Sequence, residues 1–244
     1  MENRNYRLTD IVALSSKKYD ENKFFMFNQS STNIFLNNYS YQVMLDRNFD
    51  FNLFDNIFCD GSLFAKLCSI KSRQKINRIS FDQTSAALDW IEFALRNEML
   101  VITIGGTKEE SIIFKDFLCS KFAEKSNNIH SLAGFNLDLN NLNIFKENNC
   151  LYVIGMGTPL QEEVLKEIAK NRIASKKKNI FFTCGGFISQ TANSTMKNNN
   201  FYPKYIDSLN LRWLWRMIKQ PFTIRRILFT YPRSVFSFFI NEKY

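Results

Sequence analysis

Two glycine-rich segments have the composition of anion-binding loops. Gly105-Gly106-Thr107 follows the apolar run 99–104, and the segment 155–161 (GMGTPLQ) follows the apolar run 151–154. Each leads into a stretch of helical periodicity. The backbone N–H groups of each loop are therefore predicted to lie at a helix N-terminus, where unpaired donors and the helix dipole attract anions. Because such turns occur in any α/β protein, the loops alone are a weak signal for a ligand.

Helix capping offers a second interpretation of the same residues. Thr107 and Glu110 have the spacing of a capping box. In the later segment, Thr158 suits the N-cap, Pro159 the first helical position and Gln161 the capping partner. On this interpretation Thr158 and Gln161 do nothing more than start a helix.

A carboxylate, Asp60, follows the apolar run 56–59 and precedes Gly61. Asp-Gly is among the commonest turn dipeptides, so the residues alone favour a turn here. The single histidine, His130, is expected in a surface turn rather than in a site. The five cysteines are odd in number and widely spaced, which fits a reducing compartment.

The elements that position these residues are buried strands, each ending in a polar or glycine-containing loop. Strands that alternate with helices imply a Rossmann-like α/β fold, with a mainly parallel sheet covered by helices on both faces. Ligands of such folds bind at the carboxyl ends of the strands. The predicted strands are 23–27 (ending at Asn28), 56–59, 99–104, 151–154 and 179–183, the last followed by Gly185-Gly186.

Charge divides the chain of 244 residues into two parts. Hydrophobic residues make up 45% and charged residues 23%, which is ordinary globular usage, and the net charge is +9. Residues 201–244 hold eight basic and two acidic side chains, or +6, which leaves 24 basic and 21 acidic residues, or +3, in residues 1–200. We therefore predict a Rossmann-like domain at 1–200 and a basic appendage at 201–244.

The predicted appendage combines basic and aromatic residues. The segment 207–220 is predicted to be a helix with Arg212, Arg216 and Lys219 along one side, and a second basic-aromatic stretch spans 222–239. A basic stripe is usually a solvated face, but the aromatic and aliphatic neighbours favour a helix lying on anionic lipid. The longest apolar segment, 227–240, is too short to span a bilayer, and the N-terminus has no apolar stretch of signal-peptide length.

The order of these motifs resembles the WecG/TagA/CpsF family of bacterial glycosyltransferases. The family's G-x-G-x-P-x-Q-E turn is matched at every fixed position, and Gly185-Gly186 match its later glycine-rich strand end. The segment 212–217 (RWLWRM), with Pro221 and Arg226, resembles its C-terminal motif. With the upstream Asp60-Gly61 and Gly105-Gly106 motifs, the resemblance covers nearly the whole chain. The matched positions of the turn are Gly155, Gly157, Pro159, Gln161 and Glu162.

The resemblance implies an inverting transfer of a sugar from a UDP-sugar to a polyprenyl-diphosphate-linked sugar acceptor in surface polysaccharide synthesis. It implies that Asp60 is the general base that deprotonates the acceptor hydroxyl, since a single in-line displacement needs one base beside the attacking oxygen. The donor pocket is implied at Asn28 (or Asn33, since the alignment is ambiguous), Gly61, Gly105, Gly106, Thr107, Gly155, Gly157, Thr158, Gln161, Glu162, Gly185 and Gly186.

The resemblance further implies a cytoplasmic enzyme that is peripheral on the inner face of the bacterial cell membrane. Arg212, Arg216, Arg225 and Arg226 would contact the lipid diphosphate and the anionic membrane surface. No cofactor is implied. No Asp-x-Asp pair occurs in the sequence, so we expect helix ends and arginines, rather than a metal ion, to meet the charge of the diphosphate.

Several positions depart from the family pattern. Arg212 and Gln220 stand where the family usually has Glu, and Thr223 replaces the middle of three arginines. Ser189 and Asn193 stand where Asp and Gly are common after the glycine pair. These changes leave the reaction class in place but leave the sugar open between an N-acetylmannosamine type and a hexose.

Two other functions fit parts of the sequence. A pI of about 9.3 and the basic-aromatic tail would suit a nucleic-acid-binding protein on an α/β scaffold, but that function does not explain the ordered glycine loops. A nicotinamide or flavin enzyme would need the G-x-G-x-x-G spacing, which neither loop completes. We therefore expect no nucleic-acid partner. Homo-oligomerisation stays open.

Overall fold

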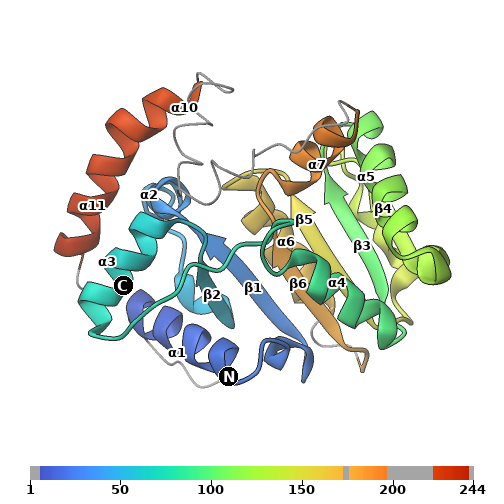
Figure 1. Ribbon diagram of the computed structural model, residues 1–244, viewed down its shortest axis with the longest axis horizontal. Coiled ribbons are helices and arrows are strands. Elements are labelled where there is room, and N and C mark those ends of the chain that lie inside the picture. Colours follow the sequence, from blue (N-terminus) through green and yellow to red (C-terminus); the bar gives the residue numbers. More distant parts are fainter. Residues whose placement is uncertain (1–5, 173–175, 197–221, 242–244) are drawn as a thin grey trace.

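Six strands form one sheet in the order β2-β1-β6-β5-β3-β4, and every pairing is parallel (Figure 1). This computed structural model describes residues 6–172, 176–196 and 222–241. The predicted parallel α/β class is confirmed. The strands are β1 (Ser31–Leu36), β2 (Asn56–Cys59), β3 (Leu100–Gly105), β4 (Ile129–Leu132), β5 (Cys150–Gly155) and β6 (Asn179–Thr183).

Helices cover both faces of the sheet. One face packs against α1 (Leu8–Glu21), α2 (Asn38–Asp46), α3 (Ser62–Ser72), α6 (Leu160–Arg172) and α11 (Tyr231–Ile240). The other packs against α4 (Ala87–Arg96), α5 (Lys108–Lys121) and α7 (Phe187–Met196). Shorter elements are α10 (Phe222–Arg225), the π-helical η5 (Arg226–Thr230) and the 3₁₀ helices η1 (Phe25–Phe27), η2 (Phe51–Leu53), η3 (Ala123–Asn128) and η4 (Leu139–Phe145).

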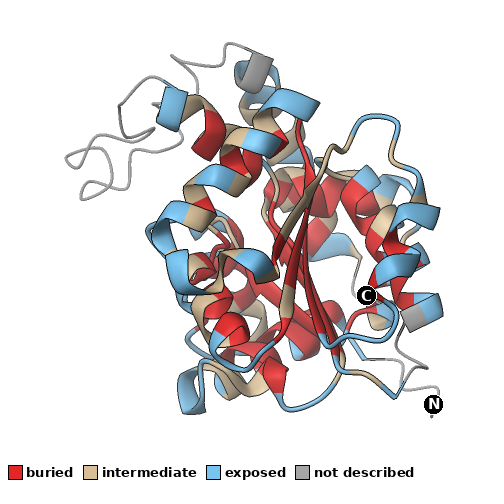
Figure 2. Ribbon diagram, turned by 90° about the vertical axis from the view of Figure 1, so that its right-hand side faces the viewer, coloured by how far each residue is buried: buried red, intermediate tan, exposed pale blue. Residues whose placement is uncertain are grey.

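Most strand residues are apolar because both faces of the sheet are buried. In β5, Tyr152 and Ile154 join one core cluster while Leu151 and Val153 join the other, and all four are fully buried. Figure 2 shows these buried strands as a central layer between helices whose outer sides are exposed. This burial is why the runs 99–104 and 151–154 could be recognised as strands from their composition.

The strand predicted at 23–27 is wrong. That segment ends in η1, and its Phe24 stacks on Phe93 of α4 with ring centroids 4.3 Å apart. The strand beside β2 is β1, which begins with buried polar residues. Thr32 donates from its hydroxyl to Asp55, and Asn33 donates to the main-chain oxygen of Phe181. Because these polar groups are satisfied by distant neighbours, β1 lacks the apolar pattern that marks the other strands.

His130 lies in β4, so the predicted surface turn is also wrong. Its ring is half-buried and lies against Phe145, with ring centroids 4.8 Å apart. Burial lowers the pKa of His130 below its usual value, and the positive charge of Lys115 lowers it further.

The C-terminal segment is partly integrated into the core. α11 packs beside α2 (Figure 1), and Phe238 is only 2% exposed between the rings of Tyr41 and Phe64. The predicted helix at 207–220, with Arg212 and Arg216, lies outside the described residues. The division at residue 200 stays a prediction. Within the described ranges, no helix is both long and apolar enough to cross a membrane.

Candidate active site

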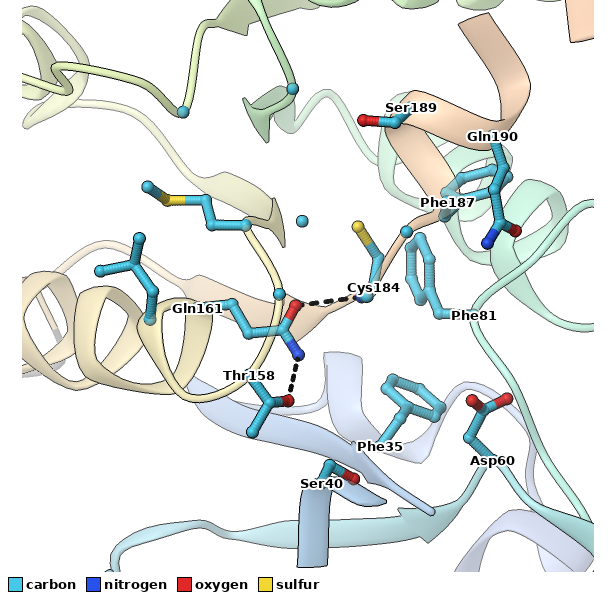
Figure 3. A pocket seen from close by; sticks show the side chains of 18 of the residues that line it. Phe35, Ser40, Asp60, Phe81, Thr158, Gln161, Cys184, Phe187, Ser189 and Gln190 are labelled. Carbon is cyan, nitrogen blue, oxygen red and sulfur yellow. Dashed lines mark hydrogen bonds between the residues drawn. The ribbon is translucent and has the colours of Figure 1, made fainter. Parts of the chain in front are cut away.

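A cavity of about 450 Å³ opens at the carboxyl edge of the sheet. Residues that follow every strand line it, because parallel strands bring all their carboxyl ends to one edge. Asn37 follows β1, Asp60 follows β2, and Gly106 follows β3. Figure 3 shows the side chains at this edge, including Asp60, Gln161 and Ser189.

The cavity brings together nine of the predicted site residues. It does not bring Asn28, Gly61, Gly105, Thr107, Glu162 or Arg225 to its lining, and Arg212 and Arg216 lie outside the described residues. The nine are Asp60, Gly106, Gly155, Gly157, Thr158, Gln161, Gly185, Gly186 and Arg226.

Asp60 is held by its backbone, while its carboxylate makes only long contacts. Its N–H donates to the oxygen of Leu36 at 2.8 Å, and its main-chain oxygen accepts from Nε of Arg78 at 2.6 Å. Within the described chain, Oδ1 lies 3.5 Å from Nη2 of Arg78, and Oδ2 accepts from Nδ2 of Asn37 at 3.5 Å. The carboxylate is thus fixed in place with lone pairs available to a substrate proton.

Asp82 is a second carboxylate in the cavity wall, but its oxygens are occupied. Oδ2 accepts from Oγ of Ser80 at 2.7 Å, and Oδ1 accepts from both N and Oγ1 of Thr84 at 2.9 and 2.8 Å. These hydrogen bonds join Asp82 to neighbouring residues of its own loop. Asp60 is therefore the better placed of the two to accept a proton.

Asn37 and Arg78 were not predicted as site residues from the sequence. Asn37 is the N-cap of α2, where its side chain accepts from the N–H groups of Tyr39 and Ser40. Asn28 is exposed and away from the cavity, and Asn33 is buried within β1. The capping box formed by Asn37 and Ser40 was a usable signal for a helix start after a strand. The sequence held no comparable signal for Arg78, because its contacts with Asp60 arise only when the chain folds.

The glycine loops differ in why they need glycine. A Cβ on Gly105 would lie 2.4 Å from the main-chain oxygen of Gly155, so glycine there lets the ends of β3 and β5 approach. Gly157 has φ of +77°, and a Cβ there would meet no atom of the described residues within 4 Å, so its need is conformational. The predicted capping box of Thr107 and Glu110 at α5 is confirmed.

The predicted capping role of Thr158 and Gln161 is wrong. α6 begins at Leu160, one residue later than predicted. The side chain of Gln161 donates from Nε2 to the hydroxyl oxygen of Thr158 at 3.3 Å (Figure 3) and also contacts two other groups. Its Oε1 accepts from the N–H of Gly185 at 3.0 Å, and its Nε2 donates to Oε1 of Glu162 at 2.8 Å. Gln161 therefore ties the loop after β5 to the loop after β6.

Glu162 lies behind the cavity wall and is fully buried. Its Oε1 accepts from Gln161 and from the hydroxyl of Thr158, while Oε2 has no hydrogen-bond partner among the described residues. Burial raises the pKa of Glu162, and the hydrogen bonds from Gln161 and Thr158 offset this only in part. From behind the lining, Glu162 supports the loop through its hydrogen bonds with Gln161 and Thr158.

The C-terminal helix contributes a cation to the cavity. The guanidinium of Arg226 lies 4.1 Å from the ring centroid of Tyr39, and both residues line the cavity. Arg225 is exposed and outside the lining. A positive charge stacked on an aromatic face keeps a fixed position beside the glycine loops.

Taken together, a parallel α/β sheet with anion-suited loops, an available carboxylate and a cation at its carboxyl edge defines a group-transfer enzyme for a phosphorylated substrate. The chain belongs to the glycosyl transferase WecG/TagA/CpsF family, whose model matches residues 23–244. It is 30% identical over 220 residues, covering 84% of each chain, to the UDP-Gal:alpha-D-GlcNAc-diphosphoundecaprenol beta-1,4-galactosyltransferase of Shigella boydii. The protein is a glycosyltransferase.

Proposed function

We propose that the protein transfers a hexose from a UDP-sugar, with inversion, to the sugar of a polyprenyl-diphosphate-linked acceptor. Galactose is the first candidate, because the Shigella boydii relative is named for UDP-Gal and for an N-acetylglucosamine-diphosphoundecaprenol acceptor. A role in bacterial surface polysaccharide synthesis goes with such an acceptor.

The observation that carries this proposal is the place of Asp60. Its carboxylate and the glycine loops line the same cavity, so a base for the acceptor and an anion-binding surface for the donor face one space. In the proposed step Asp60 takes the proton of an acceptor hydroxyl as that oxygen bonds to the anomeric carbon of the donor. The bond from that carbon to the diphosphate oxygen breaks, and UDP leaves.

The diphosphate is proposed to lie against the loops that follow β3, β5 and β6, at Gly106, Gly157 and Gly185. These three glycines have positive φ, and all three line the cavity. Backbone donors and the Arg226 guanidinium can then stabilise the charge that develops on the leaving UDP. Arg226 also supports the proposed contact of the C-terminal segment with the lipid diphosphate.

We propose that transfer does not require a divalent cation. The sequence lacks the Asp-x-Asp pair, and the loops and Arg226 supply the opposing charge. Full activity in EDTA is the expected result. Loss of activity in EDTA that is reversed by Mg²⁺ or Mn²⁺ would contradict it.

We propose that the enzyme works at the cytoplasmic face of the cell membrane and binds there peripherally. The C-terminal helices expose large apolar side chains to solvent, and the same segment reaches the cavity through Arg226. This arrangement would hold the cavity beside a lipid-anchored acceptor. The exposed side chains are Ile224, Leu228, Phe229, Phe236, Phe239 and Ile240.

The test is a panel of UDP-hexoses and UDP-N-acetylhexosamines offered with a short-chain polyprenyl-diphosphate-linked N-acetylglucosamine. Mass spectrometry reports the mass added, and NMR of the product reports the anomeric configuration. We expect one added hexose, with galactose the best donor, in a β linkage. Transfer only of an N-acetylhexosamine would overturn the proposed donor, and an α linkage formed from an α-linked donor would overturn inversion.

A further inference from the structure

The start of α7 forms a polar side of the cavity that the proposed function has not used. Ser189 and Gln190 line the cavity there. Figure 3 shows Ser189 at one side of the pocket and Asp60 at the other. The hydroxyl of Ser189 donates to Oε2 of Glu110, on α5, at 3.0 Å.

Both oxygens of the Glu110 carboxylate accept hydrogen bonds. Besides Ser189, its Oε2 accepts from the N–H of Thr107 at 2.9 Å, and its Oε1 accepts from Nδ2 of Asn193 at 3.0 Å. Asn193 also donates to the main-chain oxygen of Ser189 at 2.7 Å. One carboxylate therefore locks the N-terminus of α5 to the first turns of α7, although Glu110 and Ser189 are 79 positions apart.

This hydrogen bond determines where the Ser189 hydroxyl directs its proton. A hydroxyl has one proton to donate, and here that proton goes to a carboxylate, which when ionised can only accept. The remaining lone pairs of the Ser189 oxygen can then only accept a hydrogen bond from a ligand in the cavity. The Ser189 oxygen thus suits a ligand hydroxyl group and disfavours a phosphate oxygen, which is itself an acceptor.

The departures from the family pattern fall on these same residues. Where Asp and Gly are common, this chain has Ser189 and Asn193, and both donate to Glu110. An Asp at position 189 would place a second carboxylate against Glu110, and like charges at such range repel.

We propose that Glu110 is a positioning residue: it holds the Ser189 hydroxyl so that its oxygen accepts a hydrogen bond from a hydroxyl of the nucleotide-sugar donor. This inference rests on the proposed function. That hydroxyl belongs either to the ribose or to the transferred sugar. Because Ser189 lies across the cavity from Asp60, its hydrogen bond forms in the bound donor and persists in the transition state. Such a bond acts on KM for the donor rather than on kcat.

A double-mutant cycle tests the proposal. Ser189→Ala and Glu110→Ala should each raise KM for the donor about five-fold, the loss expected for one hydrogen bond, with kcat changed less than about two-fold. In the double variant KM should equal that of Ser189→Ala, because Glu110 acts through Ser189. Ser194→Ala is the matched control, since that hydroxyl bonds to the main-chain oxygen of Gln190 on the same helix and lies outside the lining.

A charge exchange gives a second, independent readout. Ser189→Asp alone should weaken donor binding by more than Ser189→Ala does, because two carboxylates then face each other. Adding Glu110→Gln should restore KM to within about three-fold of wild type, because an amide can donate to the introduced carboxylate. Failure of this rescue in a variant that unfolds at the wild-type temperature would overturn the proposal.

Deoxy donors identify the hydroxyl. With the donor analogue that lacks the recognised hydroxyl, the wild type and Ser189→Ala should have the same KM. A 2′- or 3′-deoxyribose analogue identifies the ribose, and a deoxyhexose analogue identifies the sugar. The proposal is wrong if Ser189→Ala still raises KM with every deoxy analogue. It is also wrong if Glu110→Ala lowers the unfolding temperature without raising KM, because the role of Glu110 is then structural only.

Failure of the positioning role of Glu110 can be distinguished from failure of the proposed function. If the wild type transfers a hexose and these variants match it, only the positioning role of Glu110 fails. If the wild type transfers none of the sugars on the panel, the same variants are compared by calorimetric titration with UDP-hexose. A five-fold loss of affinity in Ser189→Ala and Glu110→Ala then supports the positioning role without the proposed reaction.

Discussion

Two carboxylates, those of Asp60 and Asp82, face one cavity but differ in how many hydrogen bonds their oxygens already accept. The Asp82 carboxylate accepts hydrogen bonds from Ser80 and Thr84 in its own loop, whereas the carboxylate oxygens of Asp60 lie 3.5 Å from their nearest polar partners among the described residues. A general base needs a lone pair that can accept the substrate proton. The number of hydrogen bonds that each carboxylate already accepts therefore favours Asp60 over Asp82 as the base.

We predict that Asp60→Asn lowers kcat by about 10²- to 10⁴-fold, the usual contribution of a general base. The amide keeps the size of the side chain, so folding and UDP binding should be retained. Asp82→Asn is the matched control and should keep kcat within about ten-fold. Steady-state transfer assays with calorimetric titration of UDP check both. Wild-type turnover by the Asp60 variant would remove it from the mechanism.

Glu162 makes stability depend on pH. Burial raises its pKa from the usual value near 4.5, so the folded protein holds this proton more tightly than the unfolded chain does. The contribution of Glu162 to the free energy of unfolding is therefore greatest below the unfolded pKa and falls as pH rises through the folded pKa. The deprotonated form keeps an oxygen buried without a partner among the described residues.

Glu162→Gln removes this titration. We expect its free energy of unfolding, relative to wild type, to rise as pH increases from about 4 to about 8. Guanidinium unfolding followed at several pH values checks the slope, and Glu163→Gln, which removes an exposed neighbouring carboxylate, is the matched control. A constant difference between wild type and Glu162→Gln across this range would show that the pKa of Glu162 is the same in the folded and unfolded states.

At the scale of elements, the ends of β3 and β5 set the floor of the cavity. Gly105 and Gly155 stand opposite each other in the sheet register, and the missing side chain lets the two strand ends close up. The helices that follow, α5 and α6, then begin beside the cavity. The glycines match the family pattern, but the structure explains Gly105 by packing rather than by contact with a ligand.

We predict that Gly105→Ala destabilises the fold by about 1–3 kcal/mol, the usual cost of overpacking a dense interior. The methyl group would lie 2.4 Å from the Gly155 oxygen and 2.9 Å from Cδ1 of Ile188, so the strand ends must part. Chemical denaturation measures the loss. Gly61→Ala should cost less, because its nearest neighbour would be a side-chain carbon at 3.1 Å. Equal costs would argue against the packing explanation.

At the scale of the whole molecule, the C-terminal segment joins the fold and the proposed membrane surface. Phe238 is buried in the core, whereas Phe229 and Phe236 are 70% and 68% exposed. One side of the helix is thus held by α2, and the other is left with apolar groups in solvent. Such an arrangement suits a surface that gains by entering an interface.

We predict that Phe229→Ser with Phe236→Ser lowers binding to anionic vesicles at least about ten-fold, because each aromatic side chain contributes up to a few kcal/mol when buried in lipid. Folding should be unchanged, since both side chains are exposed. Vesicle sedimentation at several salt concentrations measures binding. Ile112→Ser is the matched control, on α5, which lies across the molecule from α11 (Figure 1). Undiminished binding by the double variant would place the membrane contact elsewhere.

The resemblance to a glycosyltransferase family, the α/β class and several elements were predictable from local sequence. β2 and β6 have the predicted bounds, and Thr107 caps α5 as its spacing with Glu110 indicated. These features depend on neighbours along the chain, namely runs of apolar residues and hydrogen bonds within one helical turn. Asp60 could be selected because it follows such a run and matches the family motif.

Only the tertiary structure decided which polar residues meet at the cavity. β1 escaped detection because its buried polar groups are satisfied from other strands. The asparagine predicted at 28 or 33 does not line the cavity, whereas Asn37, which follows β1, does. The contacts of Arg78 with Asp60 and of Glu110 with Ser189 join residues 18 and 79 positions apart. Hydrogen bonds of this kind follow from how strands and helices pack, so no local pattern of residues encodes them.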